Sequence, residues 1–352
     1  MNIAMISYRL PFDGKKRGGI EQMAHVLAEG LSRRGHRVSL WSYDSRPRDA
    51  SYEVYPLPGR RFFNTGLGRR ITMGYWGNVI GCVPSYRSYD AVLVHGDSIF
   101  LPFKHSRIVR VLHGSALGEA LSSSSPPRIL LQLGVYLQEV ITTLGPTICV
   151  AVSEGTRRYF PAVQYTIPNG IDRNVFSPGD GKKAAIPTIL FVGTLAGRKR
   201  GTKLIEWFLK YIRPKFPKAL LNLVCPPGPE YPGVVYHEGL SPKALAHLYR
   251  NAWILASPSL YEGFGLPYVE AMAMGTPVIA TPNPGSREIL ADGKYGLLVD
   301  DVEFGPKMVE LLADESKRQR LAVLGLERAK AFDLELMLDR YEQLLCKGRL
   351  ES

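Results

Sequence analysis

Two glutamates lie close together in the stretch SLYEGFGLPYVEAMAMGTPVIATPNPGSREIL, residues 259–290. Seven residues, including the segment GFG, separate Glu262 from Glu270. Two carboxylates can accept hydrogen bonds from the hydroxyls of a sugar, and amides at a helix start can hold a hydroxyl or a phosphate oxygen. Alternatively, Glu270 only compensates a helix dipole and Glu262 is a plain loop carboxylate. The pair alone does not decide between these roles.

Basic loops could complement these carboxylates. Residues 198–200, in the segment LAGRKRGTKLIEWF, place three cations in a glycine-flanked turn before a helix. Arginine and lysine at such a turn suit a diphosphate, although a solvated basic loop is the alternative. The first half of the chain has a similar arrangement, in which Gly18 and Gly19 open a helix after the basic residues 15–17. No G-x-G-x-x-G or Walker pattern is present, which argues against a dinucleotide dehydrogenase or a P-loop enzyme.

The elements that position these loops are strands alternating with helices. Short apolar runs such as NIAMIS, AVLVHG and TICVAVS recur in the first half, and TILFVGT, WILASPS and PVIATP recur in the second. Runs of this kind indicate strands buried on both faces of a parallel sheet. The pattern runs twice and breaks in a segment rich in proline, glycine and lysine that precedes Thr188. We therefore expect two doubly wound α/β domains, with ligands at the carboxyl ends of their strands.

Composition limits the class of protein. The chain has 352 residues and a net charge of +12, and its first 170 residues hold 20 Lys and Arg against 11 Asp and Glu. A basic first half suggests an anionic partner, namely nucleic acid, a phosphorylated substrate or an anionic membrane, unless the charge only maintains solubility. The four cysteines form no CxxC pair, so a zinc site is not expected. With neither a signal peptide nor an apolar run of about 20 residues, a cytoplasmic location is expected.

The two glutamates belong to a longer string, E-G-F-G-L-P-x-x-E-A-M-A-x-G-x-P-V-I-A, which resembles the signature of the retaining glycosyltransferases of family 4. Other stretches resemble motifs of this family in the same chain order: GGIE, VLHG, IPNGID and FVGTLAGRKRG. These motifs extend from residue 18 to residue 288. The resemblance implies the GT-B fold, in which two tandem Rossmann-like doubly wound domains face a cleft. It implies an acceptor domain at residues 1–167 and a nucleotide-sugar-binding domain at 168–333, with a terminal helix at about 334–352 packed back on the first domain.

The resemblance also implies roles for the two glutamates and the residues between them. Glu270 would bind the ribose hydroxyls of the nucleotide. Glu262 would lie near the donor sugar. Backbone amides between the two would reach sugar hydroxyls or phosphate oxygens: those of Gly263, Phe264, Gly265 and Leu266.

Four further roles follow from the same resemblance. Lys199 would neutralise the donor diphosphate, Gly19 would approach that diphosphate from the other domain, and His113 would hydrogen-bond the donor sugar. The family often has arginine where this chain has Thr194. Arg198 is therefore expected to supply the guanidinium. The catalytic set expected in this way is His113, Arg198, Lys199 and Glu262.

The expected mechanism is electrostatic. Cations on the leaving diphosphate would stabilise the charge that grows as the glycosidic bond breaks. The departing phosphate would take the acceptor proton on the same face, as proposed for the family. The two-carboxylate scheme of glycoside hydrolases fits poorly, because both glutamates lie on one short element. No D-x-D triplet is present, VDDVE at residues 299–303 being the nearest segment, so neither a metal nor another cofactor is expected.

The expected reaction moves a hexose-type sugar from a UDP- or GDP-sugar, with ADP as a third choice, to a hydroxyl of a glycan, lipid-linked or small-molecule acceptor. Residues 59–81 mix four arginines with aromatic residues, which is typical of a segment on an anionic membrane surface or of a packed acceptor-side loop. The enzyme would then be peripheral at the inner face of the membrane. His95 is a further candidate for a substrate contact.

Three other functions remain open from the sequence. A sugar-nucleotide epimerase of the same fold class would use the donor without an acceptor. A catalytically inactive sugar-binding subunit would keep the donor site. A nucleic-acid-binding protein would explain the positive charge but not the glutamate string, and no RRM, helix-turn-helix or zinc pattern supports it.

Overall fold

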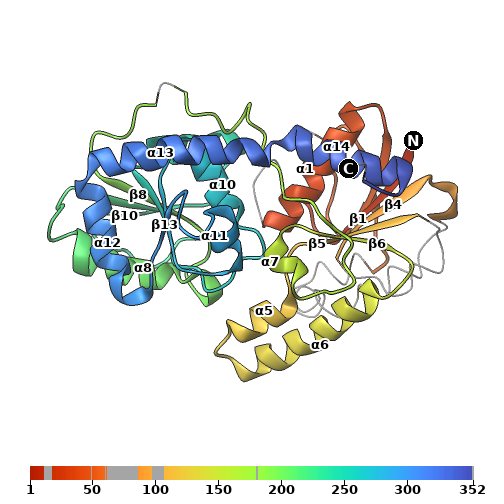
Figure 1. Cartoon of the computed structure of the whole chain (residues 1–352), viewed down its shortest axis with the longest axis horizontal. Coiled ribbons are helices and arrows are strands. Elements are labelled where there is room, and N and C mark those ends of the chain that lie inside the picture. The colour runs from red at the N-terminus through yellow and green to blue at the C-terminus, as the bar shows by residue number, and fades with distance from the viewer. Residues whose placement is uncertain are drawn as a thin grey trace. The chain divides into compact units, whose positions relative to one another are not determined.

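The computed structural model of the chain describes residues 1–11, 18–48, 50–59, 61, 86–96, 107–179 and 181–350. It divides into two compact units (Figure 1). Unit 1 comprises Met1–Asn169 together with Glu335–Ser352, and unit 2 comprises Gly170–Leu334. Thus the division falls at Asn169 and Gly170, whereas the sequence interpretation placed it between residues 167 and 168. Among the described helices, none is both long and apolar enough to cross a bilayer.

Unit 1 contains a parallel sheet of seven described strands. Apolar side chains fill the inner strands, as expected for a sheet covered on both faces. In sheet order the strands are β3 (Glu53–Pro56), β2 (Arg37–Ser42), β1 (Asn2–Ser7), β4 (Ala91–His95), β5 (Ile108–Leu112), β6 (Ile148–Ala151) and β7 (Tyr165–Thr166). The described helices are α1 (Gly19–Arg33), α5 (Ala116–Leu121), α6 (Pro126–Thr143), α7 (Glu154–Arg157) and α14 (Leu334–Lys347).

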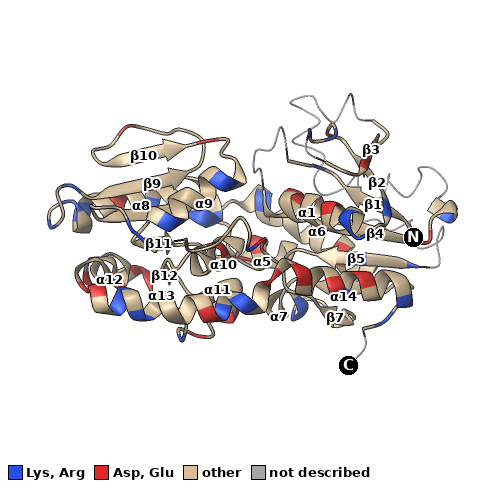
Figure 2. Cartoon of the chain, turned by 90° about the horizontal axis from the view of Figure 1, so that it is seen from above, with Lys and Arg blue, Asp and Glu red and all other residues tan. Residues whose placement is uncertain are grey.

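The last helix, α14, packs against α1 in unit 1. A side chain at Gly30 would meet Leu338 at 2.5 Å, so the two helices approach closely where α1 has glycine. Arg34 follows α1 and binds carboxylates of α14, with N–O distances of 2.5 Å to Glu335 and 2.8 Å to both Asp339 and Glu342. The acidic residues of α14 are visible in Figure 2. A cation at the end of α1 also suits the helix dipole.

Unit 2 repeats the design with a six-stranded parallel sheet. Its strands, in sheet order, are β10 (Val234–His237), β9 (Leu220–Val224), β8 (Thr188–Val192), β11 (Ile254–Ser257), β12 (Val278–Ala280) and β13 (Leu297–Leu298). Its helices are α8 (Gly201–Trp207), α9 (Pro242–Asn251), α10 (Leu266–Ala273), α11 (Pro284–Ile289), α12 (Asp301–Ala313) and α13 (Glu315–Ala329). Because β8 and β11 are neighbours, the loops that follow them lie at one edge of the sheet.

Candidate functional site

The loops after β8 and β11 are held together by the backbone and by one arginine. The N–H of Leu260 donates to the carbonyl oxygen of Arg198 at 2.9 Å. Arg200 has φ 56°, in the left-handed region. Its guanidinium binds both carboxylate oxygens of Asp301 and donates to the carbonyl oxygen of Pro258. Arg200 therefore fastens the two loops to α12.

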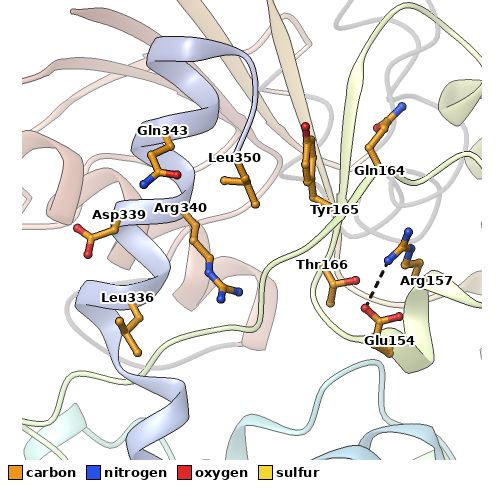
Figure 3. Close-up of a pocket in the computed structure, with 10 residues that line it drawn as sticks. All are labelled: Glu154, Arg157, Gln164, Tyr165, Thr166, Leu336, Asp339, Arg340, Gln343 and Leu350. Carbon is orange, nitrogen blue, oxygen red and sulfur yellow. Dashed lines mark ion pairs between the residues drawn. The ribbon is translucent and has the colours of Figure 1, made fainter. Parts of the chain in front are cut away.

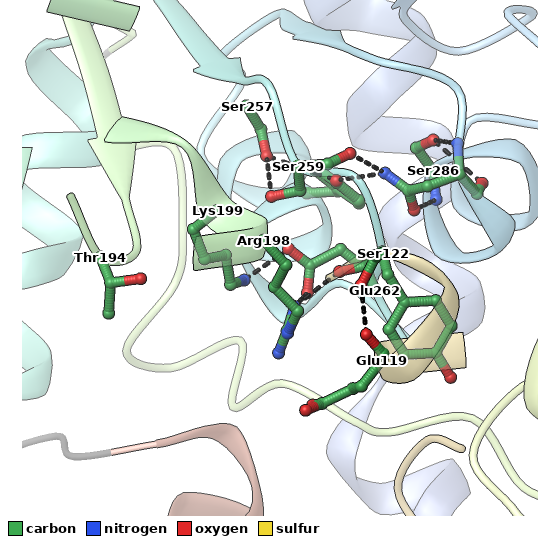
Figure 4. Close-up of polar contacts among 12 residues, drawn as sticks. Glu119, Ser122, Thr194, Arg198, Lys199, Ser257, Ser259, Glu262 and Ser286 are labelled. Carbon is green, nitrogen blue, oxygen red and sulfur yellow. Dashed lines mark hydrogen bonds and ion pairs between the residues drawn. The ribbon is translucent and has the colours of Figure 1, made fainter. Parts of the chain in front are cut away.

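Glu262 brings the other two cations together (Figure 4). Lys199 donates from Nζ to Oε1 of Glu262 at 2.5 Å, and Arg198 donates from Nη1 to Oε2 at 2.9 Å. The same Nη1 also donates to the carbonyl oxygen of Tyr261 at 2.6 Å. Each oxygen of one buried carboxylate thus receives a different cation. Glu262 lies 63 positions after Lys199 and 64 positions after Arg198 in the chain, and the fold brings the three side chains into one cluster.

The electrostatics of the cluster favour an ionised carboxylate. Glu262 is only 5% exposed. Burial by itself would raise the pKa of Glu262, but Lys199 and Arg198 outweigh burial and hold that pKa below its ordinary value. A carboxylate in this state is a poor proton donor, so the geometry does not provide the general acid that a glycoside hydrolase needs.

The segment after Glu262 turns sharply into α10. Gly265 has φ 103°, which a residue with a side chain rarely adopts, and a Cβ there would meet the ring of Tyr268. Phe264 is buried against Phe332 in an edge-to-face contact. Among Gly263, Phe264, Gly265 and Leu266, only Gly263 is not buried. The side chains here anchor the turn, and the role expected for this segment rests on its backbone.

Glu270 lies inside α10 and is 3% exposed. Tyr249, on α9, donates from its hydroxyl to Oε2 of Glu270 at 2.7 Å. Burial and the neighbouring carboxylate raise the pKa of Tyr249 well above its usual range, so its hydroxyl keeps the proton and remains a donor. A residue that only balanced the helix dipole would be exposed to solvent, whereas Glu270 is buried and oriented by a specific partner.

The sequence interpretation missed the side chains that hold the loop after β11 in place. The carbonyl oxygen of Ser259 accepts from Thr281 Oγ1 at 2.7 Å and from Asn283 Nδ2 at 3.0 Å. Asn283 and Ser286 form a reciprocal capping box that begins α11. A Cβ on Gly285 would lie 2.4 Å from the carbonyl oxygen of Phe264, so α11 must have glycine where it meets the loop. The string PNPGS carried a signal for this helix start, but nothing in the sequence signalled Tyr249.

Unit 1 contains a pair of histidines at the ends of neighbouring strands. His95 is the last residue of β4, and His113 follows β5. Nδ1 of His95 and Nε2 of His113 lie 2.8 Å apart, and the two rings are stacked. Burial lowers the pKa of His113 to about 4, and burial together with His113 lowers that of His95 well below its ordinary value. Both rings are therefore neutral at neutral pH.

Other expected features of unit 1 are only partly described. Gly19 is exposed and is the first residue of α1. The basic residues 15–17 and residues 62–81 lie outside the part of the chain that the structure describes. A polar depression lies between α7, β7 and α14 (Figure 3), lined among others by Glu154, Arg157 and Arg340. No residue of the two clusters above lines this depression, so it is separate from them.

Within the described ranges, no group of three or more His, Cys, Asp and Glu side chains is arranged to hold a metal ion. The positive charge near Glu262 comes from protein cations.

Two glycosyltransferase family models match this chain. The model of "Glycosyltransferase Family 4" matches residues 17–175, and that of "Glycosyl transferases group 1" matches residues 232–325. A phosphatidyl-myo-inositol mannosyltransferase of Mycobacterium leprae is 27% identical over 99% of this chain and 98% of its own length. A probable sucrose-phosphate synthase of Thermosipho melanesiensis is 37% identical over 40% of this chain, and the match spans only 37% of that relative.

A solved structure shows the same fold. Anabaena Alr3699/HepE, in complex with UDP and glucose, matches with a TM-score of 0.73 at 17% identity, over 98% of this chain and 99% of that one. The two family models match different halves of the chain and together cover most of it. The chain therefore belongs to the family 4-type glycosyltransferases and has the GT-B fold.

Proposed function

We propose that this glycosyltransferase moves a hexose-type sugar from a nucleotide-sugar, UDP- or GDP-linked, to a hydroxyl of a glycan, lipid-linked or small-molecule acceptor. The transfer retains the anomeric configuration and uses neither a metal nor another cofactor. The observation that carries the proposal is that Arg198 and Lys199 both form ion pairs with Glu262, at the carboxyl ends of the strands in unit 2.

The two cations are suited to a donor diphosphate. Glu262 binds both of them, which keeps their side chains in place and balances one of the two positive charges. A diphosphate offers several anionic oxygens and can engage a guanidinium and an ammonium together. As the bond to the sugar breaks, negative charge grows on the leaving diphosphate, and fixed cations stabilise that charge most.

Glu270 is suited to the ribose. A carboxylate accepts hydrogen bonds from a vicinal diol, and Tyr249 fixes the orientation of this carboxylate before the ligand arrives. Such preorganisation reduces the entropy lost on binding. The amides of Gly263, Phe264, Gly265 and Leu266 then hold sugar hydroxyls or phosphate oxygens, and Glu262 contacts the donor sugar.

The mechanism needs no carboxylic acid. Glu262 is held in the ionised form, so it does not act as a proton donor. The departing phosphate accepts the proton of the acceptor hydroxyl on the face from which it leaves, which accounts for retention. Gly19 lets the start of α1 approach the diphosphate without a side chain.

His113 contributes a neutral hydrogen-bonding group in this proposal. One of its ring nitrogens is engaged by His95, which fixes the ring and leaves the other nitrogen for a hydroxyl of the donor sugar. Since the pKa of His113 is about 4, the imidazole adds no positive charge at neutral pH. It positions the sugar rather than transferring a proton.

The acceptor is the least constrained part of the proposal. A relative matched over nearly its whole length is named for a mannosyl transfer to phosphatidyl-myo-inositol, which supports a lipid-linked acceptor. Another is named for sucrose-phosphate synthesis, which supports a small-molecule acceptor.

The direct test is product analysis with a panel of UDP- and GDP-sugars, each supplied with and without an acceptor and in the presence of EDTA. We expect a glycoside product only when an acceptor is present, with the anomeric configuration of the donor by NMR. Conversion of the donor to its epimer without any acceptor would instead establish an epimerase. An inverted product, or transfer that stops in EDTA, would overturn the corresponding part of the mechanism.

A further inference from the structure

Helix α6 turns an apolar stripe to solvent. Large aliphatic side chains lie along one side of the helix, and three of them are strongly exposed: Leu130 at 74%, Leu137 at 60% and Leu144, just after the helix, at 72%. Leu133 and Ile141, both 44% exposed, lie between them. The spacing of the five is three, four, four and three residues, so they form a single stripe on one face of the helix. We call these five residues the α6 stripe.

The side of α6 that faces unit 1 mixes polar side chains with Tyr136 and Val140, which pack against the core around Phe160. Glu139 lies there and accepts the N–H of Ala116 at 2.9 Å. Thr142 and Thr143 are the buried residues of the helix, and their hydroxyls donate to carbonyl oxygens of the preceding turn. Arg110, fully buried on β5, donates to the carbonyl oxygen of Thr142 at 2.7 Å. These polar contacts and the packing of Tyr136 and Val140 hold α6 to unit 1, and none of them uses a side chain of the α6 stripe.

The exposed apolar surface extends beyond the stripe. Leu131 is 43% exposed on α6, and Leu121, at the end of α5, is 76% exposed. Helices α5 and α6 lie side by side in unit 1 (Figure 1), joined by a contact between Arg128 and Glu119. An aliphatic surface of this extent on a single chain marks a site of interaction.

The chemistry of this surface fits a lipid bilayer better than a second helix. A helical partner would use a narrow seam flanked by complementary charges, but the surface is widened by Leu131 and Leu121, and α6 carries only Arg128 and Glu139 as charged residues. Glu139 is turned inward. Arg128 is paired with Glu119, so the basic charge is that of the first 170 residues as a whole, which carry nine more basic than acidic residues. Such a charge attracts an anionic membrane over a distance of about 10 Å.

We infer that α6 lies flat on an anionic bilayer, with the α6 stripe and Leu121 inserted among the acyl chains. Interfacial helices with an apolar face of this kind enter to about 5–10 Å. The surface lies in unit 1 and shares no residue with the cation cluster of unit 2. It adds a membrane partner to the proposed function, and it depends on that function only for the idea that the acceptor is lipid-linked.

Co-sedimentation with vesicles tests the inference. The full chain is mixed with phosphatidylglycerol–phosphatidylcholine vesicles and with pure phosphatidylcholine vesicles, without a donor. The double variant Leu130→Gln/Leu137→Gln is compared with Leu336→Gln, which changes a leucine that is 52% exposed on α14. We expect the wild type to bind anionic vesicles, the double variant to bind at least tenfold more weakly, and the control to stay within twofold of the wild type.

Two further measurements separate the possible failures. Nucleotide affinity should be the same in the double variant and the wild type, which would show that the variant is folded. If neither protein bound a nucleotide, the proposed function would be overturned, but the inference about the membrane surface would not. Equal vesicle binding by the wild type and the double variant, or none by the wild type, would overturn the inference. The inference would also be overturned if light scattering showed a dimer in the wild type and a monomer in the double variant, with unchanged vesicle binding. A second copy of the chain would then cover the α6 stripe.

Discussion

The two units hold polar clusters of opposite character. In unit 2, Arg198 and Lys199 share the ionised carboxylate of Glu262, so the cluster is built from full charges. In unit 1, His95 and His113 are hydrogen-bonded to each other and are both neutral. The comparison teaches that net charge does not locate a charged site. The first 170 residues carry most of the net charge of the chain, yet the cation cluster lies in unit 2.

The contrast also indicates a division of work. In the proposed function, charge that develops during the reaction is stabilised by the fixed cations of the cluster. A sugar needs oriented hydrogen bonds without a charge, which a neutral histidine provides. The predictions below separate these two kinds of contribution.

The largest effect should come from removing one cation. Lys199→Ala is expected to lower kcat/KM for sugar transfer by about 100- to 1,000-fold, because the leaving diphosphate loses a fixed countercharge. Steady-state kinetics with the best donor measure this. Lys203→Ala, which removes an exposed lysine of α8 paired with Glu206, is the matched control and should stay within twofold of the wild type. Equal activity of the two variants would refute the assignment of Lys199.

A smaller effect is expected at the neutral cluster. His113→Ala should lower kcat by roughly tenfold with little change in nucleotide affinity, because in the proposed function the ring contacts the sugar and not the nucleotide. Since the pKa of His113 is about 4, kcat of the wild type should show no step that depends on this histidine between pH 6 and pH 8. A large loss of UDP or GDP affinity in His113→Ala would place this residue at the nucleotide instead.

Tyr249→Phe tests a residue that acts only through another. Losing the hydrogen bond to Glu270 should weaken binding of the nucleotide by about three- to tenfold. This loss is smaller than a full hydrogen bond to a charged group would give, because water can replace the tyrosine hydroxyl in part. Calorimetry with the nucleotide and with its 2′,3′-dideoxy analogue decides the mechanism. The loss should vanish for the analogue, which has no ribose diol; an equal loss for both ligands would indicate a general defect of the fold.

The smallest effect concerns stability and pH. The pKa of His113 is about 4 in the folded chain, below its usual value of about 6.5 in an unfolded chain. Between these values the unfolded state binds more protons, so the free energy of unfolding should fall as the pH drops from 7 towards 4. His113→Gln should flatten this dependence in denaturant titrations. An unchanged slope would show that the histidine pair is already charged or exposed in the folded state.

Much of the fold was predictable because its signals are local. Alternating apolar runs and helix starts predicted two parallel α/β sheets, and the family match confirmed the GT-B fold. Placing both loops after strands of one sheet predicted that the cationic loop would lie beside the glutamates, but not that Lys199 and Arg198 would bind Glu262. This ion pairing was not predictable, because it depends on the directions in which the side chains point.

Other features could not be read from the sequence, because they depend on contacts between distant segments. Tyr249 reaches Glu270 from a different helix, and no motif surrounds it. The pairing of His95 with His113 depends on two strands lying in register. The α6 stripe was visible as leucines at helical spacing, but that spacing normally indicates a buried face, and only the structure shows the stripe turned outward.

The central claim is that unit 2 binds the donor nucleotide with protein groups alone. Isothermal titration of UDP and GDP in EDTA, into the wild type, Glu270→Ala and Lys203→Ala, tests it most directly. We predict that at least one of the two nucleotides binds the wild type, that Glu270→Ala weakens this binding at least tenfold, and that Lys203→Ala does not. Binding of neither nucleotide, or equal affinity in the wild type and Glu270→Ala, would contradict the claim.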